Sequence, residues 1–361
     1  MNAGGTRLAV SGWSTVSPFG IGAEAFRDGV LAGRSAVRTL PRDDWQVPAH
    51  HAGLVPSFDV RAVLGKKNTR SMDRATGLAV SSVGMLLEGA DPEPDQGVGG
   101  LGLVLGTTTG SVRSMMDFTR DSLTLDKPFY VDPARFPNTV MNCAAGQCAI
   151  WYGLRGPNTT IAGGQATGLL ALNYAARLLR RGHARSQLWG AVEEFSTQRA
   201  WLEWHATGLD TPMGEGCAVF RLEPVTRAAE AGRPVLAELL GLRCGVHDGT
   251  DAADVVARCV GQLFQESLVA PEDVWAVACS DYPDERAGAQ EQGLERVLDG
   301  EQPRVLCVTG LLGDTASASA AFQFAELLAV AESDPDARGR TALVTSLDRE
   351  GVVACALIRL P

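Results

Sequence analysis

Apolar side chains recur along the chain with two spacings, one typical of helices and one typical of buried strands. Helical spacing is clearest over residues 72–88, where Leu78, Val83 and Leu87 fall on one face. The same spacing predicts helices over residues 23–32, 168–181 and 315–330. Short, almost wholly apolar runs predict buried strands over residues 8–11, 101–106, 187–192, 216–222, 342–346 and 352–360. Prolines and glycines in residues 13–22 and 38–71 predict irregular connections.

A helix followed by two strands occurs twice in this pattern. The first occurrence covers residues 168–222, and the second covers residues 315–360, with a tight turn at Asp348-Arg-Glu-Gly351. The repetition predicts two similar halves, residues 1–228 and 229–361, joined around Pro224 to Pro234. Strands that alternate with helices predict an α/β fold whose sheet is covered on both faces.

Composition narrows the class of protein. The chain has 361 residues, of which 45% are hydrophobic and 20% charged, and a formal charge of −10. An acidic chain is a poor partner for nucleic acid, because phosphate binding needs clustered Lys and Arg. No apolar run reaches the ~18 residues of a membrane span, and no signal segment opens the chain. The 8 cysteines are scattered without a CxxC pair, which favours reduced thiols in the cytoplasm over disulfides or a zinc site.

Familiar cofactor and metal motifs fail on their context. Gly97 to Gly102 match G-x-G-x-x-G but precede a strand instead of following one, and we interpret them as a loop. Gly106 to Ser111 lack the lysine of a phosphate-binding loop. None of the 5 histidines has a Cys or carboxylate at ligand spacing on a shared helix face. We therefore expect neither a cofactor nor a metal.

The stretch from Gly156 to Leu172 is the most distinctive in the chain. It predicts a strand, a sharp turn of small residues and a helix, with Gln165 in the turn. Backbone N–H groups and the helix dipole at such a place would activate a thiol and stabilise an oxyanion. An amide, however, can only donate and accept hydrogen bonds.

This stretch resembles the active-site turn of β-ketoacyl synthases of the thiolase superfamily, with Gln165 where the nucleophilic cysteine stands. Further landmarks agree in order and spacing: Arg7-Leu-Ala-Val-Ser-Gly12, Val16-Ser-Pro-Phe-Gly20, Leu31-Ala-Gly-Arg-Ser35, Met72-Asp-Arg74, Pro137-Asn138, Gly190-Ala-Val-Glu-Glu194 and Gly214-Glu-Gly216. The resemblance covers essentially the whole chain. It implies a thiolase-like fold, with two similar halves in a layered αβαβα arrangement.

The resemblance also implies which catalytic groups are missing. Active members of the family use two histidines and a lysine beside the cysteine. Here Ser280 stands at the first histidine, Thr309 at the lysine and Asp314 at the second histidine, so no catalytic position is intact. The family's glycine-rich gate becomes Leu347-Asp-Arg-Glu-Gly351.

A ketosynthase-like chain without its catalysts resembles the chain-length factors of type II polyketide synthases. This implies a heterodimer with a catalytic ketosynthase subunit, an acyl carrier protein that carries the growing chain, and a tunnel at the dimer interface. We expect the tunnel candidates to be Thr109, Ser111, Val112, Ser114, Met115 and Phe118. The small Ser111 and Ser114, and the short chain, favour reduced or polyene products over aromatic ones.

Two other functions remain open at this point. Gln165 and the backbone amides of the turn could stabilise an enolate, which would make the chain a malonyl-carrier-protein decarboxylase that primes synthesis. Alternatively, Cys148 or Cys143 could be the nucleophile of a thiolase-fold acyltransferase or hydrolase. Both cysteines lie in an Ala- and Gly-rich segment that predicts a helix near a subunit interface.

Overall fold

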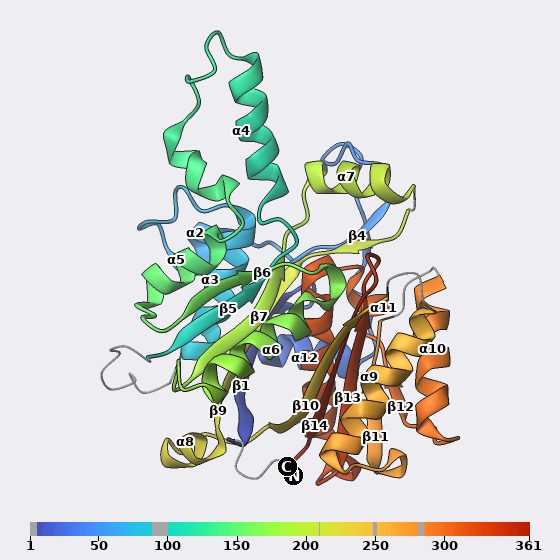
Figure 1. Cartoon of the computed structure of the whole chain (residues 1–361). Coiled ribbons are helices and arrows are strands. Elements are labelled where there is room, and N and C mark those ends of the chain that lie inside the picture. Colours follow the sequence, from blue (N-terminus) through green and yellow to red (C-terminus); the bar gives the residue numbers. More distant parts are fainter. Residues whose placement is uncertain (1–5, 89–99, 209, 248–250, 281–284) are drawn as a thin grey trace.

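The computed structural model describes residues 6–88, 100–208, 210–247, 251–280 and 285–361. Gly97 to Gly99 of the glycine motif, and Asp281 next to Ser280, lie outside these ranges. Within the described residues, eleven strands form one mixed sheet, covered by helices (Figure 1). None of the described helices combines the length and the apolarity needed to cross a membrane.

The two ends of the sheet are built in the same order. Neighbouring strands run β12 (Arg304–Leu306), β11 (Val274–Ala278), β13 (Thr341–Leu347), β14 (Val352–Arg359), β10 (Ala237–Val246), β1 (Leu8–Ser17), β9 (Gly216–Pro224), β7 (Gln187–Glu193), β5 (Gly102–Gly106) and β6 (Asn158–Ile161). The order is the same when each group of five is counted from its own edge of the sheet inward. The strand that comes third in the group's sequence lies at the edge, followed by the second, the fourth, the fifth and the first. The groups meet where β1 pairs antiparallel with β10. The division of the chain after residue 228 stays a prediction.

Alternating side chains put both faces of these strands into apolar cores. In β5, Leu103 and Leu105 pack toward α3 (Arg74–Leu87) and α5 (Cys143–Tyr152), whereas Val104 packs toward the centre of the molecule. In β13, Leu343 packs toward α9 (Ala252–Ser267), and Ala342 and Val344 pack toward the centre. A side-chain period of two explains why these strands read as continuous apolar runs.

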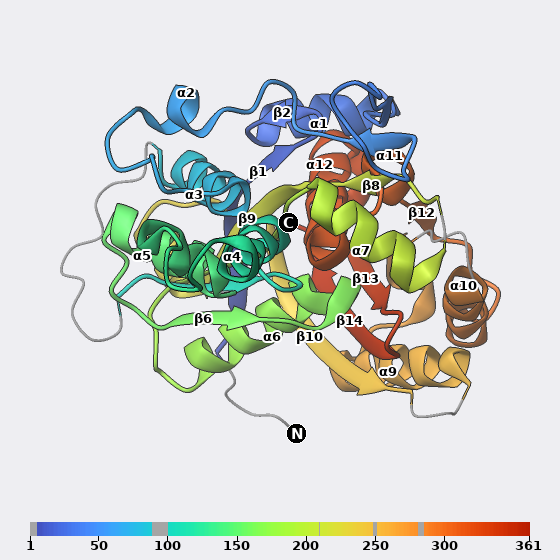
Figure 2. The ribbon, with the colours of Figure 1, turned by 90° about the horizontal axis from the view of Figure 1, so that it is seen from above.

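The central layer is made by α6 (Thr167–Arg180) and α12 (Ser319–Ser333), which contact each other between the two ends of the sheet (Figures 1 and 2). With α3 and α5 outside one end, and α9 and α10 (Glu285–Leu298) outside the other, this gives a layered α/β arrangement. Buried aromatic rings fill the centre: Trp189 stacks on Phe220 with 4.3 Å between ring centroids, and Phe324 meets both edge-on. Each such ring contributes roughly 1.5–3 kcal/mol through burial.

Shorter elements complete the described fold. The remaining helices are α1 (Ala23–Leu31), α2 (Val60–Leu64), α4 (Val112–Thr124), α7 (Thr197–Thr207), α8 (Val225–Glu230) and α11 (Thr309–Leu312), with 3-10 turns η1 (Pro133–Thr139), η2 (Gly164–Ala166), η3 (Pro271–Asp273), η4 (Ala316–Ala318) and η5 (Pro335–Ala337). β2 (Gly20–Ile21) pairs with β1, and β3 (Arg38–Thr39), β4 (His51–Gly53) and β8 (Met213–Gly214) form a small second sheet. In Figure 1, α4 projects from the body of the molecule.

The predicted connection over residues 13–22 is wrong for its first part. Instead of ending at Ser11, β1 continues to Ser17, pairing antiparallel with β9 as far as Val16 opposite Cys217. The register shifts between Val10 and Gly12, which breaks the alternation that marks a strand in sequence. Residues beyond such a bulge look like a loop until the partner strand is known.

Candidate functional site

Gln165 lies where the sequence predicts it, in a sharp turn between a strand and a helix. β6 ends at Ile161, the 3-10 turn η2 contains Gln165, and α6 begins at Thr167. The Thr167 hydroxyl stabilises the turn, because it accepts the Gly163 N–H at 2.9 Å and donates to the Gly164 carbonyl at 2.7 Å. Gln165 is only 5% exposed, so its amide is held away from bulk water.

The backbone N–H of Gln165 is already bound to an anion of the same chain. It donates to Oδ1 of Asp348 at 3.0 Å, across 183 residues of sequence. The other oxygen of that carboxylate, Oδ2, accepts the Glu350 N–H at 2.9 Å. Asp348 is 3% exposed and lies in the tight turn between β13 and β14. The carboxylate therefore joins the turn around Gln165 to the turn between β13 and β14, where the sequence predicts the counterpart of the family's gate.

Gly164 makes this close approach possible. Its φ of +54° lies in the left-handed region, and a Cβ built on it would come within 1.8 Å of Asp348 Oδ1. A larger residue would thus be strained in the backbone and would also push the carboxylate away. The small residues of the turn make room for Asp348 next to Gln165.

Ser280, Thr309 and Asp314, which the sequence predicts in place of the catalytic histidines and lysine, have separate surroundings. The Ser280 hydroxyl accepts a hydrogen bond from Gln323 Nε2 of α12 at 2.7 Å, and both residues are buried. The Asp314 carboxylate accepts the Ala316 N–H at 2.8 Å, which closes the turn into η4. The turn η4 contacts η2, which carries Gln165, whereas Thr309 begins α11, a helix that packs on β4. Ser280 and Asp314 thus each have a structural hydrogen-bond partner close by.

Two sequence landmarks of the family meet in a buried ion pair. Arg74, from Met72-Asp-Arg74, donates from Nε to Glu215 Oε2 at 2.6 Å, and Glu215 belongs to Gly214-Glu-Gly216. Glu215 is fully buried and also accepts the N–H groups of Val55 and Phe195. This saturation of a buried carboxylate assigns the two landmarks a structural role.

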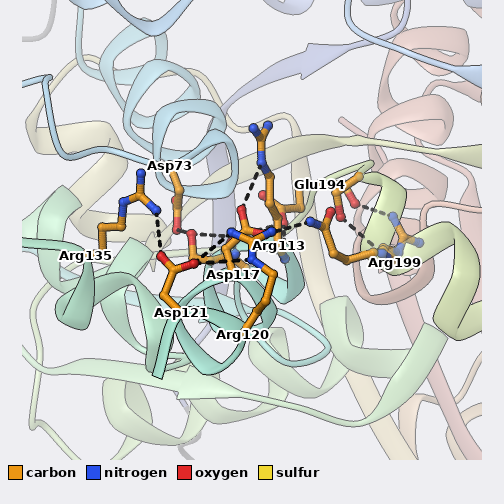
Figure 3. Close-up of polar contacts among 12 residues, drawn as sticks. Asp73, Arg113, Asp117, Arg120, Asp121, Arg135, Glu194 and Arg199 are labelled. Carbon is orange, nitrogen blue, oxygen red and sulfur yellow. Dashed lines mark hydrogen bonds and ion pairs between the residues drawn. The ribbon is translucent and has the colours of Figure 1, made fainter. Parts of the chain in front are cut away.

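The predicted tunnel segment is anchored at the first turn of α4. Ser111 caps the helix by accepting the Ser114 N–H at 3.1 Å, and its hydroxyl donates to Glu194 Oε1 at 2.9 Å. The Ser114 hydroxyl donates to Asp73 Oδ2 at 3.2 Å. Figure 3 shows Glu194 and Asp73 near this turn, with Arg113, Arg120 and Arg135 gathered around Asp117 and Asp121.

Glu194 is the most perturbed carboxyl of this cluster. Burial raises its pKa to about 7, and the neighbouring charge of Asp73 acts in the same direction. The hydrogen bonds from Ser111 and from the Arg113 N–H oppose the shift without cancelling it. The sequence indicates Glu194 only as part of a family landmark, because Ser111 and Asp73 reach it from distant parts of the chain.

The tunnel candidates do not share one environment. Ser111 and Val112 are buried, Ser114 and Phe118 are half-buried, and Thr109 and Met115 are exposed. Ser114 lines a cavity of about 970 Å³, but charged groups dominate the lining, including Arg70, Asp73, Arg113, Asp117 and Glu194. A cavity lined by charged side chains suits polar groups better than an alkyl chain. The tunnel assignment stays a prediction.

The two cysteines considered as nucleophiles lie on α5, as expected for a helix. Burial raises the pKa of the Cys148 thiol well above its ordinary value, and it raises that of Cys143 as well. Asp73 adds to the shift at Cys143. A thiol with a raised pKa is a poor source of the nucleophilic thiolate.

Comparison with known proteins agrees with this geometry. The sequence model of the protein family 'Beta-ketoacyl synthase, N-terminal domain' matches residues 6–223. The solved ishigamide ketosynthase/chain length factor is 39% identical, with a TM-score of 0.90 over 98% of this chain and 99% of that chain. The granaticin polyketide putative β-ketoacyl synthase 2 of Streptomyces violaceoruber is 26% identical over 98% of this chain and 92% of its own length.

A further relative is matched over part of its length. The 3-oxoacyl-[acyl-carrier-protein] synthase 2 of Vibrio cholerae is 27% identical over 65% of this chain, and the match spans 62% of that protein. Together, the family model, the whole-chain similarity and the layered α/β fold establish that the chain belongs to the β-ketoacyl synthase family of the thiolase superfamily.

Proposed function

We propose that this chain is a non-catalytic chain-length-factor subunit, which pairs with an active ketosynthase in a type II polyketide synthase and shapes its elongation tunnel. The observation that carries the proposal is the hydrogen bond from the Gln165 N–H to the Asp348 carboxylate. The reacting position holds an amide in place of a thiol, and the adjacent oxyanion donor already binds a negative charge.

The same contact weakens the case for a decarboxylase. An enolate formed beside Gln165 would need the N–H group that Asp348 now accepts, and the carboxylate would repel its developing charge. An acyltransferase or hydrolase based on Cys148 is also poorly supported, because that thiol is fully buried with a raised pKa.

The surface of the segment 112–141, which we call the arm, supports a protein partner. It combines α4 with η1 and exposes many large apolar side chains: Met115, Met116, Leu123, Leu125, Phe129, Tyr130, Phe136, Val140 and Met141. Leu123 is 78% exposed and Phe129 70%. Such a concentration is typical of a surface that another protein covers.

The edge of the sheet beside α5 supports the same partner face. β6 ends the strand order and is paired with β5 among the described strands. An end strand presents backbone groups that a second chain can pair with. On α5, Ile150 is 75% exposed, which extends the apolar surface from the arm toward this edge. We propose the catalytic ketosynthase as the chain that covers it.

An acyl carrier protein is the proposed source of the growing chain. The Vibrio cholerae relative is named for acyl-carrier-protein substrates, and we extend that chemistry to the complex that contains this chain. Within the complex, the tunnel residues would act sterically. A methylene group without space costs roughly 1–3 kcal/mol, enough to end elongation at a defined length.

The experiment that tests the proposal separates catalysis from chain-length control. The chain alone, and its Gln165→Cys variant, are incubated with acyl- and malonyl-carrier proteins. Neither should become acylated or release carbon dioxide above background, because Asp348 keeps the oxyanion donor occupied. Covalent acylation and extension by the isolated chain would overturn the proposal.

Product length is then measured in the complex with an active ketosynthase. Met115→Trp should shift products to shorter chains and Met115→Ala to longer ones. Thr124→Ala, on the face of α4 opposite Met115, should leave them unchanged. Products of identical length from all three variants would remove the tunnel role of this segment.

A further inference from the structure

Cys279 and Cys307 lie side by side at the carboxyl ends of two parallel strands. β11 pairs with β12 in register through Ala278 opposite Leu306, so the next residue of each strand is a cysteine. The Cys279 N–H donates to the Leu306 carbonyl at 3.0 Å, which continues the ladder to this pair. Both strands lie near α10 at one end of the sheet (Figure 1).

The two side chains point to the same side. Val277 and Cys279 of one strand, and Val305 and Cys307 of the other, all line one cavity of about 860 Å³ between the sheet and α10. The intervening Ala278 and Leu306 instead pack in the central core. The strict alternation puts both sulfur atoms on the cavity face. Both cysteines are partly exposed, so small reagents can reach them.

We infer that Cys279 and Cys307 form a reversible modification site, at which a small disulfide oxidant converts the two thiols to a disulfide. Neighbouring strands lie about 4.8 Å apart, within the roughly 4.4–6.8 Å between Cα atoms that a disulfide accepts. One cysteine thiolate attacks the oxidant and releases one small thiol. The second cysteine thiolate displaces the other, and the two cysteine protons pass to the departing thiolates.

The backbone on both sides of the bond is held in place. Backbone N–H groups of Cys307 and Val308 donate to Glu326 of α12, and Ser280, next to Cys279, accepts from Gln323 of the same helix. These contacts hold the two backbone segments beside each other, which favours closing the bond within the folded chain. The bond would link the segment that carries Ser280 to the segment that leads into Thr309.

The test uses the full chain, incubated with oxidised glutathione, blocked with N-ethylmaleimide and digested with trypsin. Cleavage after Arg258, Arg286, Arg304 and Arg338 places the two cysteines on peptides 259–286 and 305–338. Mass spectrometry should find these peptides joined, with both free again after reduction. Because the first peptide also contains Cys259, the link should persist in Cys259→Ser and disappear in Cys279→Ser and Cys307→Ser.

Oxidation should also raise the unfolding temperature of the wild-type chain by a few degrees, because the bond lowers the conformational entropy of the unfolded chain. Both single variants, which cannot form the bond, should be unchanged. Mixed disulfides of the two cysteines with glutathione, without a joined peptide, would overturn the inference. Joining that occurs only after denaturation would overturn it as well.

Discussion

At the scale of single residues, Asp348 determines whether the backbone N–H of Gln165 is available to bind another group. Its carboxylate accepts two backbone N–H groups in a buried setting, and hydrogen bonds to charged groups contribute about 1.5–3 kcal/mol each. We expect Asp348→Ala to lower the free energy of unfolding by about 2–4 kcal/mol in urea titrations, because the Gln165 N–H loses its partner. Asp43→Ala, at an exposed turn, should change it by less than about 0.5 kcal/mol. Equal effects of the two substitutions would argue against the structural role of Asp348.

Two buried glutamates give the chain a pH dependence. Burial raises the pKa of Glu194 to about 7 and that of Glu326 to about 8. Because both values exceed the ordinary one near 4.5, the folded state binds protons more tightly than the unfolded state. The stabilisation of the folded state by these two glutamates is complete below pH 4.5 and is lost as the pH rises through 7 and 8. The urea concentration at the unfolding midpoint should therefore decrease as the pH rises from 5 to 8.5.

Substitution of Glu194 measures its own contribution to the pH dependence of the free energy of unfolding. Glu194→Gln keeps an acceptor for Ser111 without the charge, so it should flatten the pH dependence by about 2–3 kcal/mol over the same range. The exposed Glu24→Gln should leave the slope as it is. If Glu194→Gln and wild type gave parallel curves, the raised pKa would not describe the folded protein.

At the scale of elements, the anchor of α4 is the most testable contact. Ser111 caps the helix and also donates to Glu194, so Ser111→Ala removes two interactions at the base of the arm. A lost cap costs about 0.5–2 kcal/mol. Limited trypsin digestion should cut faster at Arg113 and Arg120 in this variant. Ser122→Ala, whose lost hydroxyl donates to the Thr119 carbonyl of the same helix, is the matched control. Unchanged cleavage at the arm would show that the cap does not hold it.

Helices with a clear apolar face were predictable to within about two residues, as α3 and α6 show. The start of α12 was not, because the predicted helix from Thr315 is delayed to Ser319 by a turn with Ala316 at φ +43°. That turn depends on the Asp314 carboxylate, which accepts the Ala316 N–H. The end of β1 was missed for a similar reason, since its bulge is set by the pairing with β9. The local pattern gave the type of the elements it predicted, but it did not predict α9 or β10. Contacts with other elements set the ends.

At the scale of the whole molecule, the layers follow from the sequence, but the contacts of the site do not. Strands that are apolar on both faces require helices on both sides, as the cores around β5 and β13 confirm. The bond between Gln165 and Asp348, by contrast, joins residues 183 positions apart, and that between Arg74 and Glu215 joins residues 141 apart. No periodicity encodes such pairs, because only the folded topology brings β14 and η2 together.

The arm gives the proposed partnership its sharpest test, because it carries the strongly exposed apolar side chains Leu123 and Phe129. Leu123→Asp and Phe129→Asp place charge on residues that are 78% and 70% exposed, so neither change should unfold the protein. Each should weaken binding to the catalytic ketosynthase at least tenfold, since a charge buried at an interface loses its hydration. Leu268→Asp, at 92% exposure and at the end of α9, tests a surface outside the arm and should bind like wild type. Co-purification and light scattering measure the 1:1 complex. Arm variants that assemble as well as Leu268→Asp would place the partner on another face of the molecule.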